Sequence, residues 1–297
     1  MPALKAIRVC PKAVEISQLS GLPGARFLYT VQNQMPPPTN KPNIFFWSLN
    51  VLLGIAFLVE ILAPTFSPAF DAATIVLAAI ASIAALNRQL PLQNVLPAAL
   101  IAAVLGGLAH GLSAIRDVSI PLGPVFFEPA SGAKIFGTVP WTIPLLWIVA
   151  IFNARGVARL ILRPWRKVKN YGYWLIGLTA ALAVAFDVAL EPFAWHVKHF
   201  WRWLPTKLAV TWQGTTLLNF FGWAFVALLI LAFATPSLIK KQPGKQSAPD
   251  FHPLAIWLGA LLLFATGAAG AGLWWPVGVD AAIAAVTAIF AVRGAKW

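Results

Sequence analysis

The sequence predicts an all-α membrane protein, a bundle of about eight transmembrane helices with both termini on the cytoplasmic side. Three observations lead to this fold class. Hydrophobic residues make up 59% of the chain and charged residues only 10%, whereas an ordinary soluble domain carries roughly a quarter charged residues. Apolar stretches of about 20 residues, the length that crosses a bilayer, recur along the chain. Lysine and arginine are concentrated in the short segments between these stretches.

Eight apolar stretches, separated by proline, glycine or charged residues, are the expected helices. They span approximately residues 44–62, 70–86, 95–115, 139–153, 171–190, 216–235, 253–270 and 273–292. The fourth stretch is short and rich in proline, and we expect it to extend toward Leu160. Because no long polar linker separates the stretches, we expect a single transmembrane domain over residues 43–297.

The distribution of basic residues sets the expected orientation, since lysine and arginine resist translocation and collect on the cytoplasmic side. With the amino terminus inside, 17 of the 22 lysines and arginines lie in inside segments and five in outside segments. This asymmetry supports the helix count and predicts a multi-pass protein of a bacterial-type inner (cytoplasmic) membrane. It also accounts for the net charge of +13, so that the lipid bilayer, and not nucleic acid, is the expected partner.

Residues 1–42 are expected to form a cytoplasmic tail that is disordered. They contain no continuous apolar core of about 7 to 15 residues, which a signal peptide requires. Met35 stands just before the first predicted helix and could be the true start of the chain. An intact mass that includes residues 1–34 would refute a start at Met35.

Ionisable residues inside apolar stretches need an explanation, because each costs about 2.5–3.5 kcal/mol on insertion scales. Glu60 and Asp71 lie near the outer ends of the first two stretches and Asp280 lies in the last. We expect these carboxylates to reach the interface.

Asp187 and Glu191 are four residues apart and therefore project from one helix face. In a low dielectric two neighbouring carboxylates do not both ionise readily, so one can keep a proton for general acid and base chemistry. The alternative is that Glu191 and Pro192 simply end the helix in solvent.

Two polar segments accompany these acids. Residues 193–204 concentrate tryptophan, histidine and basic side chains, which we interpret mainly as an interfacial belt, leaving open that a minority face inward. In the sixth stretch Asn219 and Trp223 share a face, and Asn219 either ties helices together or contacts the two acids.

Residues 116–139 are too long and apolar for a simple loop, and we expect a re-entrant or interfacial segment that covers the site.

Several motifs then resemble one family. The runs Asp187-Val-Ala-Leu-Glu191-Pro192, Phe200-Trp201-Arg-Trp203 and Asn219-Phe-Phe-Gly-Trp223, and the proline-rich run from 137 to Trp147, are similar to the carotenoid biosynthesis proteins, which include carotenoid hydratases. The similarity covers roughly residues 105–225. It implies a hydratase-like lyase that adds water across the terminal isopropylidene double bond of an acyclic carotenoid.

The resemblance also implies roles for single residues. Asp187 and Glu191 would be the acid and the base, in an order that the sequence leaves open. Four tryptophans would offer ring faces to a carbocation, namely Trp147, Trp201, Trp212 and Trp223. Asn219, Glu128 and His110 complete the expected substrate site. A carotenoid or another long isoprenoid is the expected substrate, other membrane proteins of the pigment pathway are possible partners, and no metal or organic cofactor is needed.

The chain departs from the family pattern in two places. The family usually has a glutamate on the third helix, where residues 95–115 contain no acid and His110 is the only ionisable group. Phe126 and Phe127 replace rings that bear hydroxyls. Three outcomes are open for such a site: poor hydration, use of another acid such as Glu128, or a related function. These departures leave open a noncatalytic carotenoid-binding or assembly subunit, in which the acids are structural.

Overall fold

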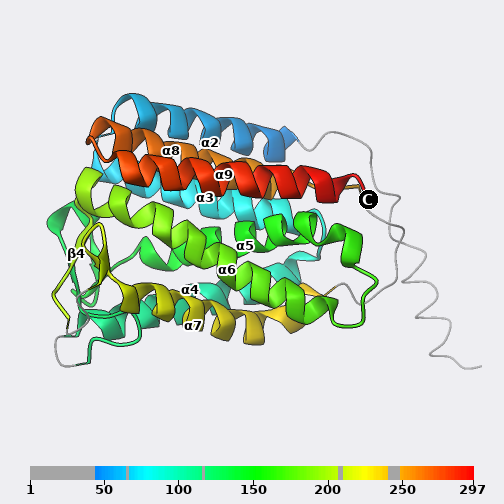
Figure 1. Cartoon of the computed structure of the whole chain (residues 1–297), viewed down its shortest axis with the longest axis horizontal. Coiled ribbons are helices and arrows are strands. Elements are labelled where there is room, and N and C mark those ends of the chain that lie inside the picture. Colours follow the sequence, from blue (N-terminus) through cyan, green and yellow to red (C-terminus); the bar gives the residue numbers. More distant parts are fainter. Residues whose placement is uncertain (1–43, 65–66, 116–117, 207–209, 240–247) are drawn as a thin grey trace, which may run out of the picture. The chain divides into compact units, whose positions relative to one another are not determined.

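The computed structural model describes residues 44–64, 67–115, 118–206, 210–239 and 248–297. Within these ranges eight helices are long and apolar enough to cross a bilayer, which confirms the predicted fold class (Figure 1). The helices are α2 (Ile44–Leu62), α3 (Pro68–Asn87), α4 (Leu92–Ala114), α5 (Ile143–Ile161), α6 (Tyr171–Pro192), α7 (Leu217–Ala234), α8 (His252–Gly270) and α9 (Trp274–Ala295). The predicted tail and the alternative start at Met35 lie outside the described residues.

Helix α5 is the central helix of the bundle. It packs against α3, α4, α6, α8 and α9, and most of its side chains are buried. The sequence placed its start near residue 139, but the helix begins at Ile143 with Pro144 in its first turn. Proline is accommodated there because the first turn has no helical partner for its missing N–H. Its end at Ile161 agrees with the predicted extension toward Leu160.

Helix α6 runs further than the sequence predicted. It continues through Pro192 into a π-helical turn over Phe193–Val197. Because Pro192 has no N–H, the carbonyl of Val188 lacks its helical donor. The indole Nε1 of Trp212 donates to that carbonyl oxygen at 3.0 Å. A side chain from a later segment therefore replaces the lost helical bond, and the helix end is held against residues 211–216.

Short strands cover one end of the helices. They form three antiparallel pairs: β1 (Val125–Phe127) with β4 (Trp201–Trp203), β2 (Lys134–Ile135) with β3 (Val139–Pro140), and β5 (Thr211–Trp212) with β6 (Thr215–Thr216). Strand β4 is labelled at the left end of Figure 1. Since side chains alternate along a strand, Trp201 and Trp203 are buried and Arg202 is exposed. These two tryptophans therefore belong to the inward-facing minority that the belt interpretation left open.

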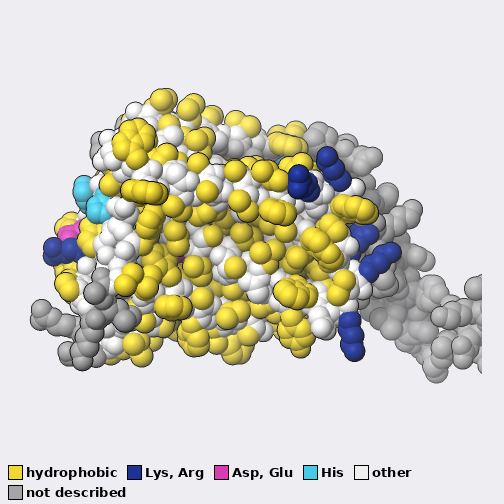
Figure 2. Space-filling view, viewed as in Figure 1, with side chains coloured by type: hydrophobic (Ala, Val, Ile, Leu, Met, Phe, Trp, Pro, Cys, Tyr) yellow, Lys and Arg dark blue, Asp and Glu magenta, His cyan; other side chains and the backbone are white. Residues whose placement is uncertain are grey.

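The flanks of the helices are apolar and the ends carry the charge. Figure 2 shows hydrophobic side chains over the flank in view, with lysine and arginine gathered at the end where the chain finishes. Exposed flank residues include Leu100, Phe225 and Phe290. An apolar flank bounded by charged ends is what a bilayer requires of a multi-pass protein.

Candidate functional site

Asp187 and Glu191 lie on one face of α6 inside the bundle. Their exposed fractions are 0% and 1%, so the alternative that Glu191 ends the helix in solvent is wrong. Asn219 on α7 joins them: its Nδ2 donates to Oδ2 of Asp187 at 2.6 Å and lies 3.3 Å from Oε1 of Glu191. Of the two uses predicted for Asn219, the structure has the contact with both acids.

One oxygen of Glu191 is surrounded by donors. Oε2 accepts from Nε1 of Trp201 at 3.1 Å, from Nε1 of Trp203 at 2.6 Å and from Oγ1 of Thr215 at 2.9 Å. Three donors on one oxygen stabilise negative charge on this carboxylate. Sequence reasoning did not assign Trp203 or Thr215 to the site. The alternation Trp201-Arg202-Trp203 was the available signal, because it places both indoles on the same side of a strand.

Asp187 is held by fewer donors. Its Oδ1 is buried and has no hydrogen-bond partner among the described residues. The same holds for Oδ1 of Asn219, Oγ1 of Thr216 and Nε1 of Trp223. Buried polar atoms are almost always paired, so these four atoms are exceptions among the described residues. The two acids thus share an amide but differ in how completely their oxygens are satisfied.

Three more of the predicted site residues form an aromatic group beside Asn219. The rings of Trp147 and Trp223 stack with centroids 3.9 Å apart, and Nε1 of Trp147 donates to Nδ1 of His110 at 3.1 Å. Gly106 on α4 makes this possible, since a Cβ at that position would lie 2.1 Å from Cγ of Trp147. The sequence predicted ring faces at these positions, and the structure adds hydrogen-bonding roles for Trp147, Trp201 and Trp212.

Glu128 is the predicted site residue that lies apart from the others. Its Oε1 pairs with Nε of Arg202 at 3.1 Å, and both side chains are partly exposed. They belong to the outer side of the β1–β4 pair, since Glu128 follows β1 and Arg202 is the outward residue of β4. The structure therefore gives Glu128 no contact with Asp187 or Glu191.

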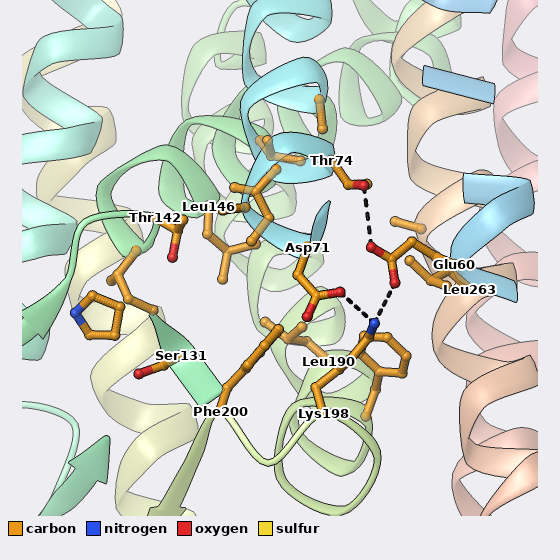
Figure 3. Close-up of a pocket in the computed structure, with 18 of the residues that line it drawn as sticks. Glu60, Asp71, Thr74, Ser131, Thr142, Leu146, Leu190, Lys198, Phe200 and Leu263 are labelled. Atoms are coloured by element: carbon orange, nitrogen blue, oxygen red, sulfur yellow. Dashed lines mark hydrogen bonds and ion pairs between the residues drawn. The ribbon is translucent and has the colours of Figure 1, made fainter. Parts of the chain in front are cut away.

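A cavity of about 90 Å³ lies on the other side of α6 (Figure 3). Its walls are apolar and come from α2, α3, α5, α6 and α8, including Leu146, Val149, Phe186, Leu190, Leu263 and Phe264. Its charged groups converge on Lys198, whose Nζ contacts the carboxylate of Glu60 and lies 2.5 Å from Oδ1 of Asp71. Oγ1 of Thr74 donates to Glu60 at 3.3 Å. The cavity therefore combines apolar walls with one buried ionic cluster.

This cluster corrects the expectation for the isolated acids. Glu60 and Asp71 do not simply reach the interface, because they enclose Lys198, which is itself buried and not part of an exposed belt. The sequence could not pair them, since more than 120 residues separate Lys198 from either acid. Asp280 does not reach the interface either: it is 1% exposed, and neither carboxylate oxygen has a hydrogen-bond partner among the described residues.

The two acid clusters meet at Trp201. Phe186 and Leu190 line the cavity, but Asp187 and Glu191, the residues that follow them, face away from it. Trp201 belongs to both sites, because it lines the cavity while its indole N–H donates to Glu191. A ligand or substitution that moves the ring of Trp201 on its cavity side would therefore also disturb the hydrogen bond from its indole N–H to Glu191.

Fold and sites together define a multi-pass helical membrane protein that encloses ionisable residues between its helices. A model of the carotenoid biosynthesis protein family matches residues 70–287, well over half of the chain. The chain belongs to this family and acts in carotenoid biosynthesis, which confirms the predicted resemblance. The match extends on both sides of residues 105–225 and includes α8 and most of α3 and α9. No curated protein and no solved structure matches the chain.

Proposed function

We propose that this protein adds water across the terminal isopropylidene double bond of an acyclic carotenoid. Asp187 gives its proton to the CH carbon of the double bond, and a tertiary carbocation forms on the neighbouring carbon. The oxygen of a water molecule bonds to that carbon, and Glu191 takes the proton that the water loses. Return of this proton to Asp187 restores the pair, so one water is added and nothing is oxidised or reduced.

The observation that carries this proposal is the unequal hydrogen bonding of two buried carboxylates that share one amide. Oε2 of Glu191 holds three donors, whereas Oδ1 of Asp187 holds none among the described residues. A carboxylate surrounded by donors is stabilised as an anion, and one with an unengaged oxygen is better suited to carry a proton in a low dielectric. This asymmetry supports Asp187 as the acid and Glu191 as the base, an order that the sequence left open.

The aromatic group beside the acids supports a cationic intermediate. Trp223 follows Asn219 by one helical turn and stacks on Trp147. An indole face stabilises a desolvated cation by about 2 kcal/mol. His110 accepts the indole N–H of Trp147, and this bond holds the ring in place. Family membership supports the substrate class.

The second candidate is carotenoid binding without chemistry. Neither Asp187 nor Glu191 lines the apolar cavity, and a fully hydrogen-bonded Glu191 also suits a structural role. In this version the cavity holds the end of the carotenoid. Glu60 and Asp71 are the acids that face such a ligand, so they provide the comparison that separates the alternatives.

Pigment analysis in a host that accumulates an acyclic carotenoid tests the proposal. The wild type is expected to yield a product heavier by one water molecule. Asp187→Asn keeps the shape of the side chain but removes the acid, and turnover is expected to fall at least about 100-fold, the lower end of general acid catalysis. Glu60→Gln is the comparison variant, because it changes a buried acid of the cavity and leaves the proposed pair intact.

Each result has a distinct meaning. Full activity of Asp187→Asn would overturn the assignment of the acid, and loss in Glu60→Gln alone would move the reaction into the cavity. If the wild type yields no hydrated product but purifies with unchanged carotenoid bound, the noncatalytic candidate replaces the enzyme. Protein levels in the membrane fraction, measured for every variant, separate lost chemistry from lost folding.

A further inference from the structure

A second, polar cavity lies at the opposite end of α5 from the strand pairs. Its volume is about 120 Å³, and four arginines line it together with Gln89, Asn153, Tyr171 and Asp250. The four are Arg155, Arg159, Arg163 and Arg166. The first three are spaced four residues apart, which places them on one side of α5 and the turn that follows it. We call this space the arginine cavity.

Two of these arginines, Arg155 and Arg159, are held by neutral acceptors. Nη2 of Arg155 donates to the carbonyl of Leu238 at 2.9 Å, and Nη1 of Arg159 donates to Oε1 of Gln89 at 2.6 Å. Within the part of the chain that the structure describes, no carboxylate lies within 4.0 Å of Arg155, Arg159 or Arg166. With respect to the described residues, these three guanidinium groups therefore retain donor capacity and carry charge that no carboxylate balances.

Asp250 is the one acid among the described residues that line the arginine cavity, and it is already engaged. Its carboxylate binds Nδ1 of His252 at 2.6 Å and accepts from Nε2 of Gln89 at 2.8 Å. Burial raises the pKa of Asp250, but the hydrogen bonds from His252 and Gln89 outweigh that effect, and the net pKa lies below its ordinary value. One carboxylate anion thus faces four arginines.

The guanidinium groups are close enough to oppose one another. Burial lowers the pKa of Arg163, and the positive charges of Arg166 and Arg159 lower it further. Orientation by inside-positive charge requires only that basic residues remain on one side of the membrane. Lys167 and Lys169 meet that requirement as exposed side chains. The need for basic residues on one side of the membrane does not explain why Arg155, which is only 6% exposed, lines a shared cavity.

We propose that the arginine cavity binds a phosphate or diphosphate group. Guanidinium forks match phosphate oxygens in pairs, and several of them around one space are typical of phosphate recognition. The volume gives room for several water-sized groups. The group has two possible sources, the headgroup of an anionic phospholipid and a soluble phosphate compound. This site is separate from the proposed hydration and stands whether or not that reaction occurs.

Thermal unfolding of the full chain in uncharged detergent tests the site. Phosphatidylglycerol and inorganic pyrophosphate are the two probes, and phosphatidylcholine is the lipid control. A ligand that binds only the folded protein raises Tm with its concentration. The site variant is Arg159→Gln with Arg163→Gln. The matched control, Lys167→Gln with Lys169→Gln, removes the same charge from exposed positions of the same segment that do not line the cavity.

We expect an anionic probe to raise Tm of the wild type and of the lysine control, with at least about tenfold weaker binding in the arginine variant. A response to phosphatidylglycerol alone identifies a lipid headgroup. A response to pyrophosphate identifies a free phosphate group as sufficient. The proposal is overturned if neither anion raises Tm of the wild type, or if both double variants lose the response equally. If the arginine variant fails to fold, Arg163→Lys is tested instead, because it keeps the positive charge but removes the guanidinium group. Unchanged affinity of Arg163→Lys for the anionic probe would also count against the site.

Discussion

The two acid clusters beside α6 solve the same physical problem in different ways. Glu60 and Asp71 enclose a lysine, so cationic charge balances them. Asp187 and Glu191 have no cation beside them among the described residues and are balanced by neutral N–H and O–H donors from tryptophan, asparagine and threonine. A cluster that includes its own counterion is suited to one charge state. A pair held by neutral donors can lose or gain a proton without breaking an ion pair, which suits acid and base chemistry.

The clusters also differ in the space beside them. The lysine cluster borders a cavity with apolar walls, where a hydrophobic ligand finds room. The acid pair lies among packed indoles, and its spare capacity consists of polar atoms without partners among the described residues. Trp201 connects the two environments. Substitutions that remove one balancing group at a time should therefore separate their energetics.

Removing the cation should have the largest effect. Lys198→Met leaves Glu60 and Asp71 buried without their counterion, and breaking a buried ion pair from one side costs about 3–5 kcal/mol. Unfolding of the purified protein in mixed micelles would measure the loss. Lys169→Met, at an exposed position, should change stability by less than about 0.5 kcal/mol.

A rescue variant tests the cause of that loss. Lys198→Met combined with Glu60→Gln and Asp71→Asn removes the uncompensated charge, and it should be more stable than the single variant. If the triple variant is as unstable as Lys198→Met alone, the lysine contributes through packing and not by balancing the two acids. The comparison between the clusters would then lose its electrostatic basis.

Within the acid pair, the two carboxylates should respond unequally. Glu191→Gln disturbs an oxygen that accepts three donors, and weakening hydrogen bonds to a charged group costs about 1.5–3 kcal/mol. Asp187→Asn keeps an oxygen that can accept from Asn219, so its cost should stay below about 1 kcal/mol. The same unfolding measurement compares the two variants. Equal costs would remove the asymmetry on which the assignment of acid and base rests.

The membrane-spanning helices could be predicted from the sequence because the signals are local. A run of apolar residues of sufficient length predicts a spanning helix without knowledge of its neighbours, and charge between runs predicts orientation. The four-residue spacing of Asp187 and Glu191 is equally local, whereas the sequence left open whether Asn219 ties helices together or contacts these acids. The structure contains these contacts.

The ionic cluster escaped prediction because its members are distant in sequence. Lys198 stands in a segment of tryptophan and histidine whose composition is typical of an interface, and nothing local indicates that its ammonium turns inward to Glu60 on the first described helix. The end of α6 was missed for a related reason. Proline normally ends a helix, but here Trp212 replaces the missing bond at Val188 from outside the helix.

The aromatic group beside the acid pair offers the finest test. In Gly106→Ala the new methyl would lie 2.1 Å from Cγ of Trp147, so the ring must shift, and overpacking of this kind costs about 1–3 kcal/mol. Alanine recovers roughly 0.5–1 kcal/mol of helix propensity, so the net loss should be smaller than the loss expected for Lys198→Met. Gly54→Ala is the matched control in α2, because no atom lies within 4 Å of its added methyl.

The sign of the difference decides the role of the ring. Gly54→Ala should be neutral or slightly stabilising, whereas Gly106→Ala should destabilise and weaken the bond between Trp147 and His110. If Trp147 stabilises a carbocation, Gly106→Ala should also slow hydration while the acids remain intact. Equal stability of the two alanine variants would mean that Trp147 can move freely, and a freely moving ring could not hold a face toward the reacting carbon.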